Sequence, residues 1–320
     1  LVSDTSYAIC KSMGKELAGF ADIFEEADLD MLVLLGDRFE IQMAAVAAML
    51  YRIPVAHIHG GELTQGLMDD AIRHSVTKMS DLHFTSTSEY AQRVIQMGEQ
   101  PERVFCVGAL GIENIKSIRL LSREQLCQKF GDIFLHNYIM VTYHPVTLEK
   151  HTAGIQFQKL LNVVENHPEY HYIFTYANAD TDGAIINKMI ESYTQEHKNT
   201  KAFVSMGQLG YLSALQHCSA VLGNSSSGII EAPSFHIPTI NIGDRQKGRV
   251  RAKTVIDCGY ETRDIEQALT ESQNQKFKDL CQESTNPYEG KNTSEQIIMQ
   301  IKKYLNQVQG KQKIFYYIEV

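Results

Sequence analysis

Short apolar runs alternate with amphipathic stretches along almost the whole chain, and this alternation constrains the fold more than any other feature. Strands and helices that alternate in this way imply parallel sheets with helices on both faces, so we predict an α/β protein. The predicted strands cover residues 31–35, 55–58, 82–85, 104–107, 138–142, 172–175, 202–204, 220–222 and 239–242. The predicted helices cover residues 41–51, 69–79, 88–97, 122–129, 154–165, 182–196, 209–216 and 228–235.

The chain has 320 residues, which is enough for two α/β domains that each bury a core of their own. We predict a boundary just after residues 130–132, because two helical stretches precede this point and a new strand follows it. The predicted parts are an N-terminal Rossmann-like domain over residues 1–133, a C-terminal Rossmann-like domain over residues 134–305 and a tail over residues 306–320. The aromatic run at residues 314–318 needs a surface to pack on, either a domain or a partner subunit.

Composition excludes several classes of protein. A net charge of −8 argues against nucleic-acid binding, although an anionic small molecule needs only a few local donors. The longest apolar run, around residues 41–50, is too short to span a bilayer, and residues 1–4 do not start a signal peptide. The six cysteines form no Cys-x-x-Cys pair, so we expect reduced thiols in a cytoplasmic protein, with neither disulfides nor zinc.

A serine-rich stretch at residues 223–228 follows the apolar run at residues 220–222 and leads into a predicted helix. Backbone N–H groups and hydroxyls at the start of a helix favour an anion such as phosphate. Glu231, one to two turns further on, could then reach a ribose diol, and Arg245 could add a charged contact. The alternative is a serine-rich turn that only caps the helix. The predicted phosphate contacts are Ser225, Ser226 and Ser227.

Four carboxylates follow strands of the first half of the chain: Asp37, Glu62, Asp69 and Asp70. Ligands of parallel sheets bind at the carboxyl ends of the strands, so we expect these side chains to converge. Carboxylates that lie close together repel one another, which raises the pKa of at least one and suits acid–base catalysis. The alternative for Asp37, and for Asp69 or Asp70, is a helix N-cap.

Histidines also stand at strand ends. His57 and His59 are two residues apart, so both are predicted to point to the same face of a strand. A metal site there lacks a clear third ligand. The glycines at 60–61 allow the backbone to approach a ligand closely. His144 ends a later strand and could donate to a phosphate or leaving group, or be an exposed loop histidine. Asn178 could bind a ligand or make an Asx turn.

Five motifs occur here in one order. They are Gly-Asp-Arg-Phe-Glu at 36–40, His-Ile-His-Gly-Gly-Glu at 57–62, Asp-Asp-Ala-Ile-Arg-His-Ser-Val-Thr-Lys at 69–78, Gly-Asn-Ser-Ser-Ser-Gly-Ile-Ile-Glu at 223–231 and Asn-Ile-Gly-Asp-Arg-Gln-Lys-Gly-Arg at 241–249. With these motifs, the sequence resembles the hydrolysing UDP-N-acetylglucosamine 2-epimerases of bacterial sialic acid and capsule synthesis. The resemblance covers essentially the whole chain.

The resemblance implies a GT-B-like fold, with two Rossmann-like parallel-sheet domains and an active site in the cleft between them. It implies that a base removes the sugar C2 proton, that UDP leaves to give a 2-acetamidoglucal, and that water adds to give N-acetylmannosamine. It also implies no cofactor or metal, a UDP-sugar as the small-molecule partner, and a homo-oligomer, either dimer or tetramer.

The resemblance further implies residue roles. Asp37 and the Asp69/Asp70 pair match the acid–base positions of the family, and Glu62 matches the Glu of its His-Gly-Gly-Glu loop. His144 matches a histidine that assists the diphosphate or leaving group. The positions that match nucleotide contacts are Ser225, Ser226, Glu231 and Arg245. Arg38 and His59 are additional candidates.

Two departures from the family pattern bear on the assignments. Relatives begin with a strand and a Gly-Ser/Thr-Arg-Ala-Glu-Tyr loop that helps to bind the diphosphate, whereas this sequence starts in the helix before the Asp37 strand. We expect a first domain without that unit to be unstable or inactive. Some relatives carry a catalytic Glu where His59 stands, so the base is either Glu62 or Asp37. A glycosyltransferase of the same fold and a UDP-sugar-binding protein without turnover are the alternative functions.

Overall fold

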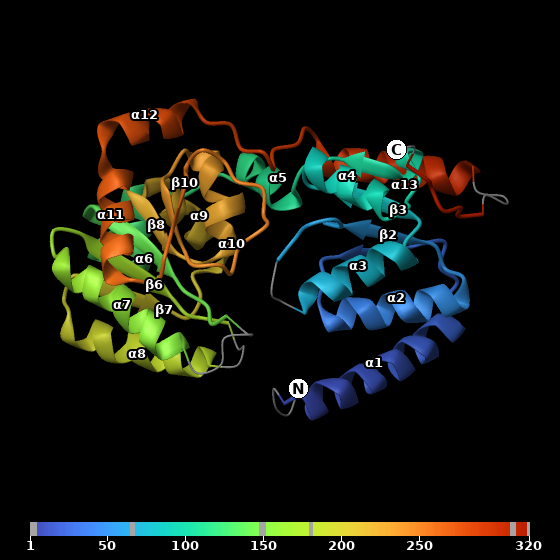
Figure 1. Cartoon of the computed structure of the whole chain (residues 1–320), viewed down its shortest axis with the longest axis horizontal. Coiled ribbons are helices and arrows are strands. Elements are labelled where there is room, and N and C mark those ends of the chain that lie inside the picture. Colours follow the sequence, from blue (N-terminus) through green and yellow to red (C-terminus); the bar gives the residue numbers. More distant parts are fainter. Residues whose placement is uncertain (1–4, 65–67, 147–151, 179–181, 308–311, 319–320) are drawn as a thin grey trace. The chain divides into compact units, whose positions relative to one another are not determined.

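The computed structural model describes residues 5–64, 68–146, 152–178, 182–307 and 312–318. The chain forms two compact units (Figure 1). Unit 1 combines Leu1–Glu113 with Tyr288–Val320, and unit 2 is Asn114–Pro287. Both are built on parallel sheets flanked by helices, so the predicted α/β class is confirmed.

The sheet of unit 1 has four parallel strands in the order β1-β2-β3-β4. β2 and β3 are buried along their whole length, and each contains a buried histidine, His57 and His83, among mainly apolar residues. β1 is an edge strand and leaves Val33 and Leu35 exposed. The strands are β1 (Leu32–Leu35), β2 (Val55–Ile58), β3 (Leu82–Thr85) and β4 (Val104–Cys106).

Helices cover both faces of this sheet (Figure 1). Phe24 and Ala45 of α1 and α2 pack with Val55 on one face. On the other face Ile297 of α13 packs with Phe84, so the end of the chain returns to complete unit 1. The helices are α1 (Ser6–Glu26), α2 (Phe39–Tyr51), α3 (Asp69–Met79), α4 (Ser88–Gln96) and α13 (Thr293–Gln307), with the short η1 (Pro101–Arg103).

The sheet of unit 2 has six parallel strands in the order β10-β9-β8-β5-β6-β7. The order of the strands reverses between β5 and β8, which is a topological switch point of the kind that holds ligands in open α/β sheets. The strands are β5 (Tyr138–Thr142), β6 (His171–Thr175), β7 (Thr200–Phe203), β8 (Ala220–Gly223), β9 (Thr239–Ile242) and β10 (Val255–Cys258).

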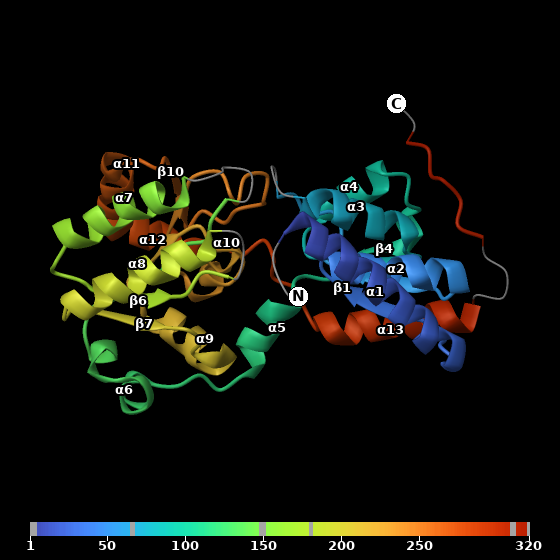
Figure 2. The same ribbon diagram turned by 90° about the horizontal axis from the view of Figure 1, so that it is seen from below.

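Two core clusters lie on opposite faces of this sheet. Phe157 and Ile186 belong to one cluster, and Figures 1 and 2 show their helices α7 and α8 side by side. Leu126 and Leu215 belong to the other. The α-helices of unit 2 are α6 (Arg123–Phe130), α7 (Ala153–Asn166), α8 (Gly183–Glu196), α9 (Gly207–His217), α10 (Ser226–Ile230), α11 (Thr262–Gln273) and α12 (Gln275–Glu283). Two short 3₁₀ helices are η2 (Asp132–Leu135) and η3 (Ala232–Phe235). Helix α5 (Leu110–Ser117) connects unit 1 to unit 2.

The structure divides the chain earlier than the predicted boundary after residue 133. Leu126 of α6 packs with Phe134 and Tyr138, so α6 belongs to unit 2. Residues 288–305, predicted as part of the second domain, belong to unit 1, because α13 packs on the first sheet. The sequence alone does not show which sheet a helix near a boundary covers.

The six cysteines all lie in described residues and are free thiols, as predicted. Within the described ranges, each helix falls short of the length and apolar character that a bilayer crossing requires.

The aromatic run at residues 314–318 contacts the rest of unit 1, but its five side chains are exposed. The Tyr316 N–H donates to Gly98 O at 2.9 Å. Lys313 Nζ lies 2.8 Å from the carboxylate of Glu99, which is fully buried, and also donates to Ser80 O. Burial alone would raise the pKa of Glu99, but hydrogen bonds from His83, Lys313 and Lys78 outweigh it and lower the pKa to about 2.

We predict that Lys313→Met lowers the free energy of unfolding by about 1–3 kcal/mol at pH 7, because Glu99 loses one of its charged donors. A carboxyl with a depressed pKa stabilises the fold above its unfolded value, near 4.5, and this stabilisation is lost as pH falls toward 2. The difference between variant and wild type should therefore shrink below about pH 5 in urea titrations. The exposed Lys302→Met is the control, and an equal loss in both variants would contradict the account.

Candidate functional site

Arg73 of α3 contacts two of the four predicted carboxylates of unit 1. Its Nε donates to Asp37 Oδ2 at 3.0 Å, and its Nη2 also contacts that oxygen. Its Nη1 donates to Asp70 Oδ1 at 2.6 Å. Arg73 is only 1% exposed. Asp37 and Asp70 thus converge as predicted, but around a buried cation that offsets the repulsion expected between them.

The N-cap alternatives for these carboxylates are wrong. Helix α2 has Arg38 at its N-cap, and α3 has Met68 there. Asp70 instead faces back toward the loop after β2 and accepts from Thr64 N at 2.7 Å. Asp69 lies beside it in the first turn of α3 and is half-buried.

Glu62 is buried and held by two side chains. Its Oε1 accepts from Ser86 Oγ at 3.0 Å and lies 2.9 Å from His59 Nδ1. Strand β2 ends at Ile58, and His59 has a φ of 69°, so the prediction that His57 and His59 share a strand face is wrong. A positive φ at His59 turns its ring toward Glu62.

His57 is a core residue. Its Nε2 lies 2.8 Å from Gly36 O, and burial, opposed by that contact, lowers its pKa to about 3. A Cβ on Gly61 would lie 2.4 Å from Tyr90 O, so this position has no room for a side chain. Close approach of a ligand to the glycines at 60–61 stays a prediction. Among the described residues, no three His, Cys, Asp or Glu side chains are grouped as a metal site. Arg38 forms an exposed ion pair with Glu40 at 3.2 Å.

In unit 2 the switch point brings the segments after β5 and β8 together. Asn224, directly after β8, is fully buried. Its Oδ1 accepts from His144 N at 2.7 Å, and its Nδ2 donates to His144 O at 2.8 Å. Its own carbonyl accepts from Arg245 Nη1 at 3.2 Å. Asn224 therefore fixes the backbone of His144 and brings Arg245 to the same point.

The proton position on His144 follows from its contacts. The backbone N–H of Asn178 donates to His144 Nδ1 at 3.2 Å, which places the ring proton on Nε2. Burial, aided by the nearby charge of Arg245, lowers the pKa of His144 to about 3. His144 is buried rather than an exposed loop residue, and it is a neutral Nε2–H donor near pH 7. Asn178 contributes its backbone, while its side chain is exposed.

The serine loop is ordered by its own hydroxyls. Ser225 is the N-cap of α10 and accepts from Ser227 N at 3.3 Å, and Ser226 begins the helix. Ser227 accepts from Tyr211 at 2.8 Å and donates to the carboxylate of Glu231. Burial raises the pKa of Glu231, and the bond from Ser227 opposes that shift. The predicted helix over 228–235 is in fact α10 followed by η3, so Glu231 lies at the end of α10.

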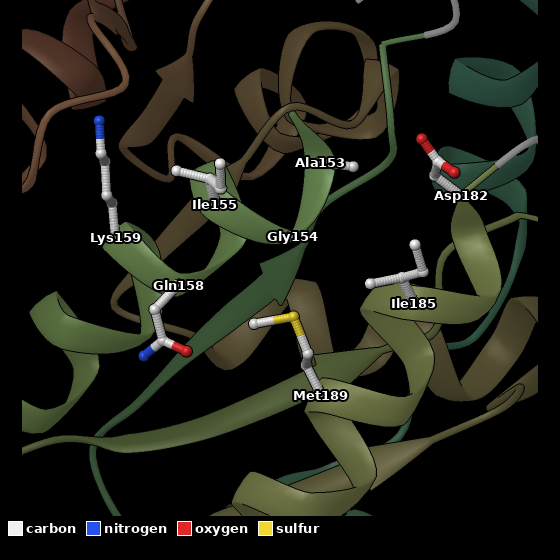
Figure 3. A pocket seen from close by; sticks show the side chains of 8 residues that line it. All are labelled: Ala153, Gly154, Ile155, Gln158, Lys159, Asp182, Ile185 and Met189. Carbon is white, nitrogen blue, oxygen red and sulfur yellow. The ribbon is translucent and has the colours of Figure 1, made fainter. Parts of the chain in front are cut away.

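A pocket of about 580 Å³ lies elsewhere in unit 2, between α7 and α8 (Figure 3). Its lining is largely aliphatic, with Ile155 of α7 and Ile185 and Met189 of α8. None of the predicted site residues lines it.

Two residues that the sequence analysis did not select organise these sites. Arg73 lies three positions after Asp70, which places both on one face of a helix. Asn224 lies in the serine-rich stretch, directly after the strand. Spacing could have suggested both, but burial of their side chains depends on the tertiary fold.

Known proteins resemble this chain in sequence and in fold. The family described as UDP-N-acetylglucosamine 2-epimerase matches residues 1–302. The chain belongs to this epimerase family.

Two relatives are close to this chain in sequence. "Polysialic acid biosynthesis protein P7" of Escherichia coli is 41% identical over 317 residues, which cover 98% of this chain and 81% of that protein. "GDP/UDP-N,N'-diacetylbacillosamine 2-epimerase (hydrolyzing)" of Campylobacter jejuni is 40% identical over 279 residues, which cover 87% and 72%.

Solved structures share the fold of this chain. The S. aureus MnaA–UDP structure has a TM-score of 0.79 and 18% identity, with 95% of this chain and 82% of that chain covered. The UDP-GlcNAc 2-epimerase from Neisseria meningitidis bound to UDP-GlcNAc also has a TM-score of 0.79, with 20% identity and coverage of 94% and 83%. The predicted GT-B-like class is confirmed at the level of two parallel-sheet α/β units.

We predict that His144 stays neutral, with its proton on Nε2, from pH 5 to pH 8, because burial lowers its pKa to about 3. Ring ¹⁵N chemical shifts of histidine-labelled protein measure both properties. The His144→Gln variant assigns the signal by its disappearance. An imidazolium signal that grows in as pH falls through 6.5, or a proton on Nδ1, would contradict the assignment.

Proposed function

We propose that this epimerase hydrolyses UDP-N-acetylglucosamine with inversion at C2. A base takes the C2 proton, the C1–O bond breaks with its electron pair leaving on UDP, and a 2-acetamidoglucal forms. Water then adds across the double bond, with hydroxyl at C1 and a proton at C2, to give N-acetylmannosamine for sialic acid synthesis. The observation that carries this proposal is the gathering of Asp37 and Asp70 around Arg73 in a member of the 2-epimerase family.

The carboxylates of unit 1 would carry out the proton transfers. We assign the C2 base to Asp37, whose side chain is 27% exposed, rather than to Glu62, which is 5% exposed and bonded to Ser86. Both Arg73 contacts go to Oδ2 of Asp37, which leaves Oδ1 for the proton. Positive charge that develops at C1 as UDP leaves makes the C2 proton acidic enough for a carboxylate. Asp70 and Asp69 would serve the second proton transfer, to the glucal.

Unit 2 would bind UDP and stabilise it as a leaving group. The Nε2–H of His144 and the guanidinium of Arg245 can donate to diphosphate oxygens, and both are fixed by Asn224. Ser225 and Ser226 are the proposed phosphate contacts. Glu231, oriented by Ser227, is the proposed ribose ligand. Asn178, whose backbone N–H donates to Nδ1 of the His144 ring, is a further proposed UDP contact. Donors aimed at developing charge are the largest contribution to many enzymatic rates.

The proposed reaction determines what else the protein needs. Elimination followed by hydration changes no net oxidation state, so the chemistry requires no redox cofactor. We propose a UDP-sugar as the partner, neither nucleic acid nor membrane, and a cytoplasmic location, in keeping with the free thiols. We also propose a homo-oligomer, a dimer or tetramer, which light scattering of the purified protein tests.

A second substrate is favoured by the relatives. The C. jejuni protein, at 40% identity, is named for diacetylbacillosamine, and so is a relative from Legionella pneumophila at 37% identity. UDP-N,N'-diacetylbacillosamine would undergo the same elimination and hydration at C1 and C2, so the proposed chemistry of the carboxylates would be unchanged.

Proton NMR in D2O with each UDP-sugar tests the proposal. We predict that UDP is released and that the free 2-epimeric sugar carries deuterium at C2, because the glucal takes its new proton from solvent. Heat-inactivated protein is the control. Release of UDP with hydrogen retained at C2 would exclude elimination, and UDP-N-acetylmannosamine as the product would make the enzyme non-hydrolysing.

A further inference from the structure

Arg73 uses every donor that its side chain has. A guanidinium carries five N–H groups in a planar fork. Nε and one Nη2 proton go to Asp37, and the other Nη2 proton goes to Thr64 Oγ1 at 3.1 Å. The two Nη1 protons go to Asp70 Oδ1 at 2.6 Å and to Glu62 O at 2.7 Å. One side chain thus joins the end of β1, the loop after β2 and the first turn of α3.

A buried arginine bonded to two carboxylates contributes little to the stability of a fold. Removing a charge from water costs several kcal/mol, and buried ion pairs are often replaced by apolar side chains without loss of stability. Arg73 is 1% exposed, and the carboxylates that it contacts remain 27% and 23% exposed at Asp37 and Asp70. The guanidinium is therefore buried, while the two carboxylates that it contacts are partly exposed and accessible to a substrate.

We propose that Arg73 is a positioning residue for the acid–base pair of the epimerase reaction. It fixes Asp37 and Asp70 relative to one another, balances their charge, and leaves Oδ1 of Asp37 for the C2 proton. This inference rests on the proposed function. Lysine keeps the charge but lacks the planar fork, so it cannot hold both carboxylates and the Glu62 carbonyl together.

The test is the Arg73→Lys variant, with UDP-N-acetylglucosamine carrying either hydrogen or deuterium at C2. We expect kcat to fall by about 100-fold, since a misplacement of about 1 Å can cost that much, while KM changes by less than about threefold. Proton removal then becomes slower than the other steps, so the deuterium isotope effect on kcat should exceed that of the wild type.

Arg93→Lys is the matched control. Arg93 donates to Gly61 O at 2.6 Å, in the same loop, and pairs with Glu89 rather than with the site carboxylates. We expect its kcat and isotope effect to stay at wild-type values. If Arg73 only stabilises the fold, Arg73→Lys will lower the melting temperature and the active fraction, but leave KM and the isotope effect unchanged, and the inference is then wrong.

Thr64→Val keeps the inference testable if Arg73→Lys does not fold. It retains the buried charge but removes the hydroxyl that contacts both Arg73 and Asp70. We expect a smaller fall in kcat, about tenfold, with the same rise in the isotope effect, and wild-type values would overturn the inference. If the wild-type protein leaves every UDP-sugar intact, both the proposed function and this inference are wrong. If the wild type turns over substrate and the variants behave like it, only this inference is wrong.

Discussion

All strand pairs in both sheets are parallel, and the placement of the candidate sites depends on this constraint. Parallel strands direct their carboxyl ends to one edge, so segments distant in sequence meet there. Asp37 follows β1 and meets α3 at that edge in unit 1. His144 follows β5 and meets Asn224 after β8, at the point where the strand order reverses. The chemistry is therefore a consequence of the topology.

In each unit one buried polar side chain then fixes the reactive groups. Arg73 satisfies its charge with two carboxylates, and Asn224 satisfies its amide with both backbone groups of His144. Buried polar groups are costly unless fully bonded, so each of these side chains admits few alternative geometries. The proposed division of labour follows, with proton transfer in unit 1 and UDP binding in unit 2.

The sequence predicted much of the fold because buried strands are short apolar runs. The strands at 55–58, 82–85, 138–142 and 239–242 match the structure to the residue. β10 was not predicted, because Asp257 interrupts its apolar pattern and is accommodated by Asn241 and Arg251 only in the folded protein. The helix over 228–235 was predicted whole, but Pro233 lacks the N–H that would continue α10.

The candidate site was predictable as far as residue type and strand ends allowed. Asp37 and Asp70 converge on Arg73 as predicted, whereas Glu62 reaches Arg73 only through its backbone carbonyl. The predicted shared face of His57 and His59 is wrong, because strand β2 stops one residue before His59. The most direct test of the central claim measures both UDP affinity, by calorimetry, and kcat for the Asp37→Asn and Glu231→Gln variants. The account predicts that Asp37→Asn binds UDP like the wild type with turnover lost, while Glu231→Gln mainly loses UDP affinity. The opposite pattern, or loss of both properties in both variants, would contradict it.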